Sequence, residues 1–386
     1  MKVPVLVTAG GAGWEARALE AIADSGNRLV LLKRCLDLSD LLASAATGSA
    51  SVAVVGADVV GLDSDAVRAL KRDGVSVVVV HDQHDSERLT RLGVDHHVEA
   101  SSLALLADVL EGAAPQHLAF VEPPAAPTYG GQLVAVWGPA GAPGRTTVAA
   151  GIAAELAHRQ EGTLLLDADP CGGALAQHLG VLDQVSGLLA SARLANGGEL
   201  DAVRLAGCAR ALGKHLRVLT GLPRADRWVE VRPAAFEELM TTAVTLEPNV
   251  VVDTGFCLEQ DSGAGAGRHA MTLSALGRAD QVVVVGAADP VGLTRLVRGL
   301  HDLGEVTDRV PVVVVNRMRS TLGWSEGDIA ATIHGVRPDA RVTFLPEDRL
   351  AVDRALMAGR SLVESGDSPL RRAVAGLADS LALVRS

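Results

Sequence analysis

A glycine-rich segment followed by two threonines has the residue types and spacing to bind phosphate. It reads GPAGAPGRTT and lies between the apolar stretch LVAVW and the helical pattern VAAGIAAELAHR. A buried strand, a glycine-rich turn and a helix N-terminus together form a phosphate-binding loop (P-loop), where backbone N–H groups and the helix dipole hold the anion. The sequence therefore predicts a nucleotide site, with the Thr146 hydroxyl on Mg²⁺. The predicted nucleotide contacts in this loop are Gly138, Gly141, Ala142, Gly144, Arg145, Thr146 and Thr147.

The loop departs from the usual P-loop pattern at two positions. Arg145 stands where lysine is usual, and the first glycine falls on Pro139 or, with one extra residue, on Gly138. Arginine keeps the positive charge and can hold two phosphate oxygens, but its side chain is longer and planar. The residues of the loop alone leave open a glycine-rich turn without a ligand.

Acidic side chains follow two apolar stretches further along the chain. Asp167 and Asp169 come after the first stretch, and Asp253 comes after the second and is followed by Thr254 and Gly255. Carboxylates are the protein ligands that Mg²⁺ prefers, and such an acid can hold the metal beside nucleotide phosphates. Each acid alone could be a helix cap or a turn residue. All three in this order at strand ends favour a magnesium–nucleotide site.

Apolar stretches separated by helical patterns predict the elements that position these residues. Buried strands at this spacing indicate a doubly wound, mostly parallel α/β sheet. The predicted strands are Leu133–Trp137, Thr163–Leu166, Leu216–Leu219, Val250–Val252, Gln281–Val285, Val312–Val315 and Val342–Leu345.

A smaller α/β domain is predicted before this one. The segment VEPPAAPTYGGQ has the composition of a linker, so the expected division is residues 1–120, a linker over 121–132, and residues 133–386. Strand–helix alternation in the first part predicts a parallel sheet. Its predicted strands are Val3–Val7, Arg28–Leu32, Ser51–Val55, Ser76–Val80 and His96–Val98, and its predicted helices are Glu15–Ala23, Leu36–Ala46, Ser64–Asp73 and Asp85–Leu92.

Composition limits the class of protein. Formal net charge is −11, which argues against a chain whose main task is to coat DNA, although a local basic face stays open. The four cysteines have no paired spacing, so neither a disulfide framework nor a zinc site is expected, and a reducing cytoplasm fits. No stretch is long and apolar enough to predict a membrane span. The amphipathic segment SPLRRAVAGLADSLALVRS is expected to pack on the sheet rather than on a membrane.

The order and size of the first part resemble the receiver domain of two-component response regulators. A working receiver has acidic residues after its first strand, where this chain reads TAGG. Asp58 lies slightly late for a phosphoacceptor, and no lysine follows the fifth predicted strand. Without the acids there is no magnesium site for phosphotransfer. The resemblance therefore predicts a pseudo-receiver that docks protein partners.

The second part resembles the MinD/ParA family of P-loop ATPases. The resemblance rests on the P-loop, the DADP segment, the strand ending DTG, and the later segments VVVVNRMRS and FLPEDRLAVDRALMAGRSL. Together with the receiver-like part, it points to the branch of CpaE/TadZ-like localisation ATPases. The fold it implies is the P-loop NTPase sheet, and the cofactors it implies are ATP and Mg²⁺.

The resemblance also implies residue roles. Asp169 would orient the attacking water, with Arg145 as the catalytic cation. Thr146, Asp253 and Asp167 would serve the metal, and Asn316, Arg317 and Pro346 would surround the adenine.

The resemblance implies a switch that positions a septum, pilus or chromosome and dimerises with ATP. The family's second, signature lysine is missing, since its position is Ala140. This leaves hydrolysis open, with Arg145 in cis or Arg268 in trans as substitute cations. The alternative is a nucleotide-binding adaptor that does not hydrolyse ATP. An ATP-dependent ligase or kinase on the same fold is a third possibility, but no substrate motif supports it.

Overall fold

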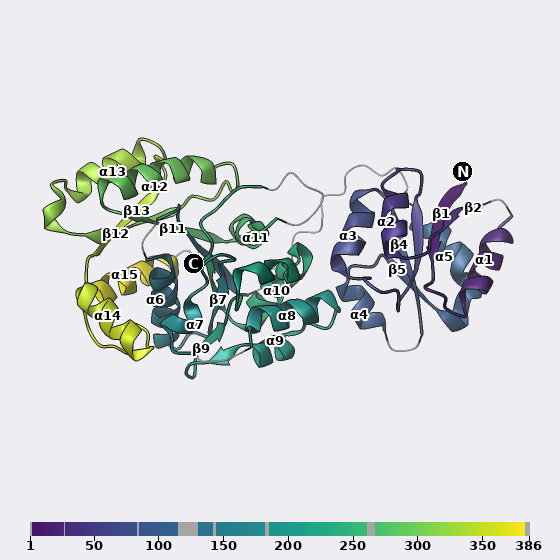
Figure 1. Cartoon of the computed structure of the whole chain (residues 1–386), viewed down its shortest axis with the longest axis horizontal. Coiled ribbons are helices and arrows are strands. Elements are labelled where there is room, and N and C mark those ends of the chain that lie inside the picture. The colour runs from purple at the N-terminus through teal and green to yellow at the C-terminus, as the bar shows by residue number, and fades with distance from the viewer. Residues whose placement is uncertain are drawn as a thin grey trace. The chain divides into compact units, whose positions relative to one another are not determined.

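The computed structural model describes residues 2–26, 28–82, 85–114, 130–141, 144–181, 185–260 and 267–382 (Figure 1). The chain divides into two compact units. The first comprises Met1–Pro127 and Leu194–Glu199, and the second comprises Thr128–Arg193 and Leu200–Ser386. Residues 121–129, most of the predicted linker, lie outside the described residues, and Gln132 is the first residue of a strand.

The first unit is built on a five-stranded parallel sheet in the order β2-β1-β3-β4-β5. This is the flavodoxin-like order of doubly wound domains. Its strands are β1 (Val3–Thr8), β2 (Leu29–Arg34), β3 (Val52–Gly56), β4 (Ser76–His81) and β5 (His96–Glu99). Its helices are α1 (Glu15–Ala23), α2 (Leu38–Ala45), α3 (Ser64–Arg72), α4 (Ser86–Arg91), the 3₁₀ helix η1 (Ala100–Leu105) and α5 (Leu106–Ala113).

Alternating side chains of the central strand β3 supply two separate cores. Val52 and Val54 belong to the core that also holds α1 and α5, whereas Ala53 and Val55 belong to the core that holds α2 and α3. A strand buried on both faces accounts for the unbroken apolar run in the sequence. The sheet predicted for this unit is therefore confirmed.

Several elements of the first unit differ from the predictions, since β2 spans Leu29–Arg34 rather than Arg28–Leu32 and η1 was not predicted. Helix α2 begins at Leu38 rather than Leu36, because the Asp37 side chain accepts a hydrogen bond from the backbone N–H of Asp40 (2.8 Å) and caps the helix there. Leu36 is left 89% exposed. Helix α5 was not predicted, and it covers the sheet with Leu106 and Leu110.

The second unit contains an eight-stranded sheet in the order β13-β12-β11-β6-β10-β7-β9-β8. All strand pairs are parallel except β8 with β9. The seven predicted strands are found, and only the two-residue β8 was missed, since a strand so short leaves no period in the sequence. The strands are β6 (Gln132–Trp137), β7 (Thr163–Ala168), β8 (Arg210–Ala211), β9 (Leu216–Leu219), β10 (Asn249–Thr254), β11 (Gln281–Ala287), β12 (Val312–Met318) and β13 (Arg341–Pro346).

Helices cover both faces of this sheet, as the doubly wound prediction requires (Figure 1). One face carries α6 (Arg145–His158), α7 (Leu175–His178), α14 (Arg349–Ala358) and α15 (Pro369–Ala382). The other carries α10 (Pro233–Leu246), α11 (Ala270–Arg278), α12 (Pro290–Leu303) and α13 (Glu326–His334). The remaining helices are α8 (Gly187–Asn196), α9 (Ala202–Cys208), η2 (Ala225–Glu230) and η3 (Ser320–Leu322).

Helix α6, which follows the phosphate loop, is buried almost all round. Every residue from Val148 to Leu156 is buried, because the sheet lies on one side of the helix and α15 on the other. Gly151 permits the close approach of α15, since a Cβ there would lie 2.9 Å from a methyl group of Val374. The apolar face of α15 is thus used within the unit. Among the described residues, no helix is long and apolar enough to cross a bilayer.

Truncating a core strand of the second unit is expected to destabilise the chain. Leu165 on β7 is fully buried among α6, β9 and β10, so Leu165→Ala should lower the free energy of unfolding by about 2–5 kcal/mol, measured by urea denaturation. Leu350→Ala is the matched control, because Leu350 is 79% exposed, and it should change stability by less than about 0.5 kcal/mol. Equal effects of the two substitutions would contradict the packing described.

Candidate functional site

The predicted phosphate loop joins β6 to α6. Gly141 and Gly144 have φ angles of +73° and +94°, in the left-handed region that favours glycine. Gly144 is the N-cap of α6 and offers no side-chain acceptor, so no side chain caps the first backbone N–H groups of the helix. Such groups, together with the helix dipole, bind anions. Ala142, also predicted to contact nucleotide, lies outside the described residues.

The Arg145 side chain folds back over this loop. One guanidinium nitrogen donates to the Gly138 carbonyl (3.1 Å), and another lies 3.3 Å from Oδ2 of Asp169. The side chain is only 15% exposed, and its Nε has no hydrogen-bond partner among the described residues. A buried cation with an unsatisfied N–H is well placed to donate a hydrogen bond to an incoming phosphate oxygen.

The three predicted acids meet at the carboxyl ends of β7 and β10. Asp167 and Asp253 face each other in the register of the two strands, and they are 2% and 1% exposed. Asp167 accepts hydrogen bonds from the backbone N–H groups of Leu175 (3.1 Å) and Asp169 (3.3 Å). Neither carboxylate oxygen of Asp253 has a hydrogen-bond partner among the described residues.

Burial changes the protonation of two of these acids. It raises the pKa of Asp167 to about 7. Burial, and then the neighbouring Asp167 charge, raise the pKa of Asp253 well above its ordinary value. The Thr146 hydroxyl and the Arg145 guanidinium lower the pKa of Asp253, but only in part. Two adjacent buried carboxylates resist ionising together unless a cation joins them.

The donor set fits Mg²⁺ rather than a metal held by protein alone. Asp253, whose oxygens accept no hydrogen bond within the described ranges, lies beside the Thr146 hydroxyl. Mg²⁺ binds through one or two carboxylates while keeping waters and phosphate oxygens. Within the described ranges, no group of three or more His, Cys, Asp or Glu side chains is arranged to hold a metal.

Asp169 is held in place by its own loop. Its Oδ1 accepts hydrogen bonds from the backbone N–H groups of Cys171 (2.9 Å) and Gly172 (3.1 Å). Gly255 lies against it, since a Cβ on Gly255 would be 3.3 Å from Oδ1 of Asp169. The carboxylate is thus oriented toward Arg145 and the phosphate loop.

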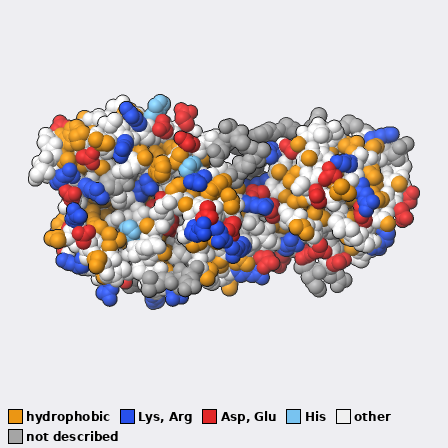
Figure 2. Space-filling model, in the orientation of Figure 1, with side chains coloured by type: hydrophobic (Ala, Val, Ile, Leu, Met, Phe, Trp, Pro, Cys, Tyr) orange, Lys and Arg blue, Asp and Glu red, His pale blue; other side chains and the backbone are white. Residues whose placement is uncertain are grey.

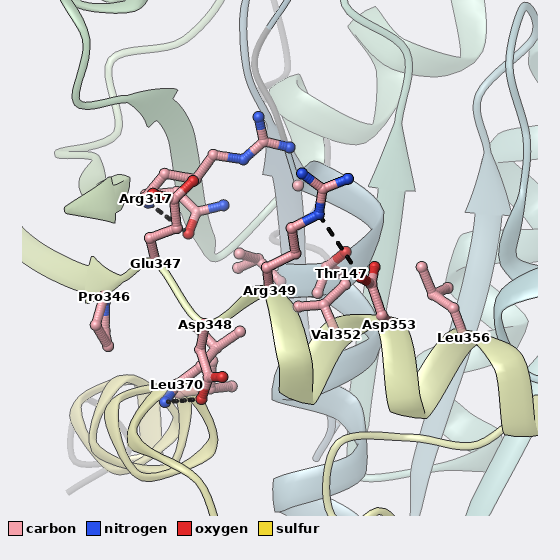
Figure 3. Close-up of a pocket in the computed structure, with 14 residues that line it drawn as sticks. Thr147, Arg317, Pro346, Glu347, Asp348, Arg349, Val352, Asp353, Leu356 and Leu370 are labelled. Atoms are coloured by element: carbon pink, nitrogen blue, oxygen red, sulfur yellow. Dashed lines mark hydrogen bonds and ion pairs between the residues drawn. The ribbon is translucent and has the colours of Figure 1, made fainter. Parts of the chain in front are cut away.

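A pocket of about 390 Å³ opens beside the phosphate loop (Figure 3). It brings the three residues predicted to surround a base, Asn316, Arg317 and Pro346, together with Gly144 and Thr147. The Arg317 and Arg349 side chains extend to the same side of the pocket (Figure 3). The other lining residues are Val148, Glu347, Asp348, Val352, Asp353, Leu356, Leu370 and Val374.

Asn316 connects this pocket to the phosphate loop. Its Oδ1 accepts a hydrogen bond from the Arg317 backbone N–H (2.9 Å), and Arg317 has a φ of +60°, which is uncommon outside glycine. A Cβ on Gly144 would overlap Nδ2 of Asn316 and lie 3.7 Å from its Cγ. Glycine at position 144 is therefore required both by its φ angle and by the contact with Asn316.

Other residues of the site were not predicted from the sequence. Gly173 and Gly221 border Asp167, and a Cβ on either would lie within 3 Å of its carboxylate group. His178 lies 3.4 Å from the Thr147 hydroxyl. Gly221 comes two residues after the predicted strand Leu216–Leu219. Its place after the carboxyl end of a strand could have predicted that it lies near the site. Arg268, a predicted substitute cation, is exposed and follows residues 261–266, which lie outside the described residues.

Solved structures share this architecture, although no family model and no curated protein matches the chain. A ParA-family ATPase from Chlorobium tepidum is 17% identical, with a TM-score of 0.55, and the match covers 64% of this chain and 98% of that chain. The cell-division ATPase MinD of Pyrococcus furiosus is 21% identical, with a TM-score of 0.53 over 66% and 99% of the two chains. MinD of Pyrococcus horikoshii, solved with Mg-ADP, is 19% identical, with a TM-score of 0.51 over 66% and 98%.

The chain has the fold of the MinD and ParA ATPases. The predicted fold class is thereby confirmed. The identities are too low to transfer ligands or residue roles, which stay predictions for this chain.

Removing a buried carboxylate is expected to stabilise the ligand-free chain at high pH. The raised pKa of Asp253 means that the folded state binds its proton more tightly than the unfolded state, so stability falls as pH rises from about 4 through the folded pKa. Asp253→Asn should therefore raise the melting temperature at pH 8, by an amount equivalent to about 1–3 kcal/mol, and much less at pH 5.

The control for this prediction is Asp308→Asn, because Asp308 is exposed. It should leave the melting temperature unchanged at both pH values. Greater stability of the wild-type chain than of Asp253→Asn at pH 8 would show that the carboxylate is already satisfied.

Proposed function

We propose that the second unit binds Mg-ATP. The observation that carries the proposal is Asp253, a buried carboxylate that accepts no hydrogen bond from the described residues, beside Thr146 and the N-terminus of α6. Phosphates on the loop would contact the backbone N–H groups of α6 and complete a magnesium site with Thr146 and Asp253, next to Asp167. The base would enter the 390 Å³ pocket beside Asn316, Arg317 and Pro346.

Arg145 would change partners when nucleotide binds. In the ligand-free chain it contacts Asp169, and a phosphate competes for the same guanidinium. Release of Arg145 would leave Oδ2 of Asp169 free to orient a water, while Oδ1 stays on the backbone of Cys171 and Gly172. Mg²⁺, when bound, offsets phosphate charge. Hydrolysis in this scheme is slow, because arginine and lysine place their charge differently.

The cellular role we propose is that of a cytoplasmic localisation switch of the CpaE/TadZ-like type. ATP would favour a homodimer, and the first unit would dock protein partners as a pseudo-receiver. That unit has the flavodoxin-like strand order, and Thr8-Ala9-Gly10-Gly11 follows β1 in place of acids. Among proteins of the same fold, MinD of Aquifex aeolicus forms a complex with MinC. The structure positioned by this chain would be a septum, pilus or chromosome.

Surface charge bears on the class of partner. On the face shown in Figure 2, acidic and basic side chains of the described residues are intermixed. DNA-coating proteins instead gather their basic side chains into a continuous surface. On this face the charge pattern therefore fits a protein partner better than a nucleic acid.

The second candidate function is an adaptor that binds nucleotide without hydrolysing it. Two positions favour it, since Ala140 and Arg145 stand where the MinD/ParA pattern has lysines. Nucleotide binding would then set the conformation of the second unit, and no hydrolysis step would end that state.

Nucleotide affinity tests the binding site. Arg145→Ala should weaken Mg-ATP binding about 10–100-fold, because a charge-assisted contact to phosphate is lost, and Arg145→Lys should restore most of it. Affinity is measured by isothermal titration calorimetry. Arg354→Ala, on the exposed face of α14 and outside the pocket, should bind as the wild type does. Wild-type protein that binds no ATP would rule out the proposed function.

Phosphate release separates the switch from the adaptor. Asp169→Ala should abolish most ATP-dependent phosphate release while ATP still binds, because this carboxylate is proposed to orient the attacking water. The measurement is single-turnover hydrolysis of radiolabelled ATP. A wild-type chain that binds ATP and releases no phosphate would support the adaptor instead.

A further inference from the structure

A second arginine, Arg295 of helix α12, lies against the phosphate loop. Arg295 lies on α12, and a Cβ on Gly141 would overlap its Nη1 and lie 3.2 Å from its Cζ. The guanidinium therefore rests on the backbone of the loop, next to Ala140. Ala140 stands where the MinD/ParA pattern has its signature lysine.

Close contacts of α12 with Trp137 and Pro139 hold Arg295 there. Gly299 lies one turn after Arg295 on the same helix face, and a Cβ on it would be 3.0 Å from the Trp137 ring and 3.1 Å from Pro139. The start of α12 is fixed by Asp289, whose side chain accepts hydrogen bonds from the N–H groups of Val291 (3.1 Å) and Gly292 (3.0 Å). These contacts fix the position of α12 and so place the Arg295 side chain beside the loop.

In the part of the chain that the structure describes, no carboxylate pairs with this arginine. Arg295 forms no ion pair or hydrogen bond with the described residues, and it is exposed. It lines a groove of about 230 Å³ beside the loop together with Arg298 and Asp302. The remaining lining residues are Trp137, Pro139, Ala140, Phe256, Leu258 and Gly299. Arg145, in contrast, is paired with Asp169.

We propose that Arg295 contacts the terminal phosphate of a bound nucleoside triphosphate and makes the site prefer the triphosphate over the diphosphate. It would supply, from the same chain, the charge missing at Ala140. A guanidinium suits this role because it is always charged and presents several N–H donors to phosphate oxygens. The inference rests on the proposed nucleotide binding and adds a residue that separates ATP from ADP.

The test compares two arginines of α12. Arg295→Ala should weaken Mg-ATP binding about tenfold and leave Mg-ADP binding within about twofold, because ADP lacks the phosphate that Arg295 contacts. Arg298→Ala removes an exposed arginine from the same helix and groove and should change neither affinity. Arg295→Lys keeps the charge and should recover part of the preference for ATP. Affinities are measured by calorimetry on the full chain, and circular dichroism checks that each variant is folded.

Each result has one meaning. Equal losses for ATP and ADP, or no loss, in folded Arg295→Ala would overturn the inference and leave the proposed function standing. The same ATP-specific loss in Arg298→Ala would also overturn it, since the effect would then come from the general charge of the groove. A wild-type chain that binds neither nucleotide would overturn the proposed function and this inference with it.

Discussion

Two carboxylates buried side by side are the constraint around which the second unit is organised. Asp167 and Asp253 sit opposite each other on neighbouring parallel strands and are almost completely removed from water. Isolated buried charges are costly, so the ligand-free chain keeps its protons on these acids longer than an exposed carboxyl would. Under the proposed function, a bound cation with its phosphates would offset the two charges. Ligand binding would then be linked to loss of protons from these acids.

The core makes that arrangement rigid. Strands of valine and leucine, buried on both faces, fix the register that places the acids opposite each other, and α6 is clamped between the sheet and α15. Close-packed interiors of this kind do not adjust to a misplaced side chain. The phosphate loop, the three acids and the pocket lined by Asn316 lie at the carboxyl ends of these strands, which is where doubly wound sheets bind ligands. Arg145 connects the loop to Asp169 across that edge.

Much of this could be predicted from the sequence, because buried parallel strands leave continuous apolar runs. The strands and the acids at their ends follow directly from those runs, and the parallel sheet then requires Asp167, Asp169 and Asp253 to lie near one another. Contacts between elements far apart in the chain could not be predicted in this way. The approach of Arg295 to Gly141 depends on how closely α12 lies against Trp137 and Pro139, and the glycines around Asp167 come from two separate loops. Short elements such as β8 leave no pattern at all.

The most direct test of the central claim, that nucleotide occupancy controls self-association, is the molar mass of the chain in solution. Size-exclusion chromatography with light scattering would compare the ligand-free protein with samples in Mg-ADP and Mg-ATP. The account predicts that the mass doubles only with Mg-ATP and that Asp169→Ala retains this dimer after the wild-type dimer has dissociated. A mass that is the same in all three samples, although ATP binds, would contradict the switch and leave a nucleotide-binding adaptor.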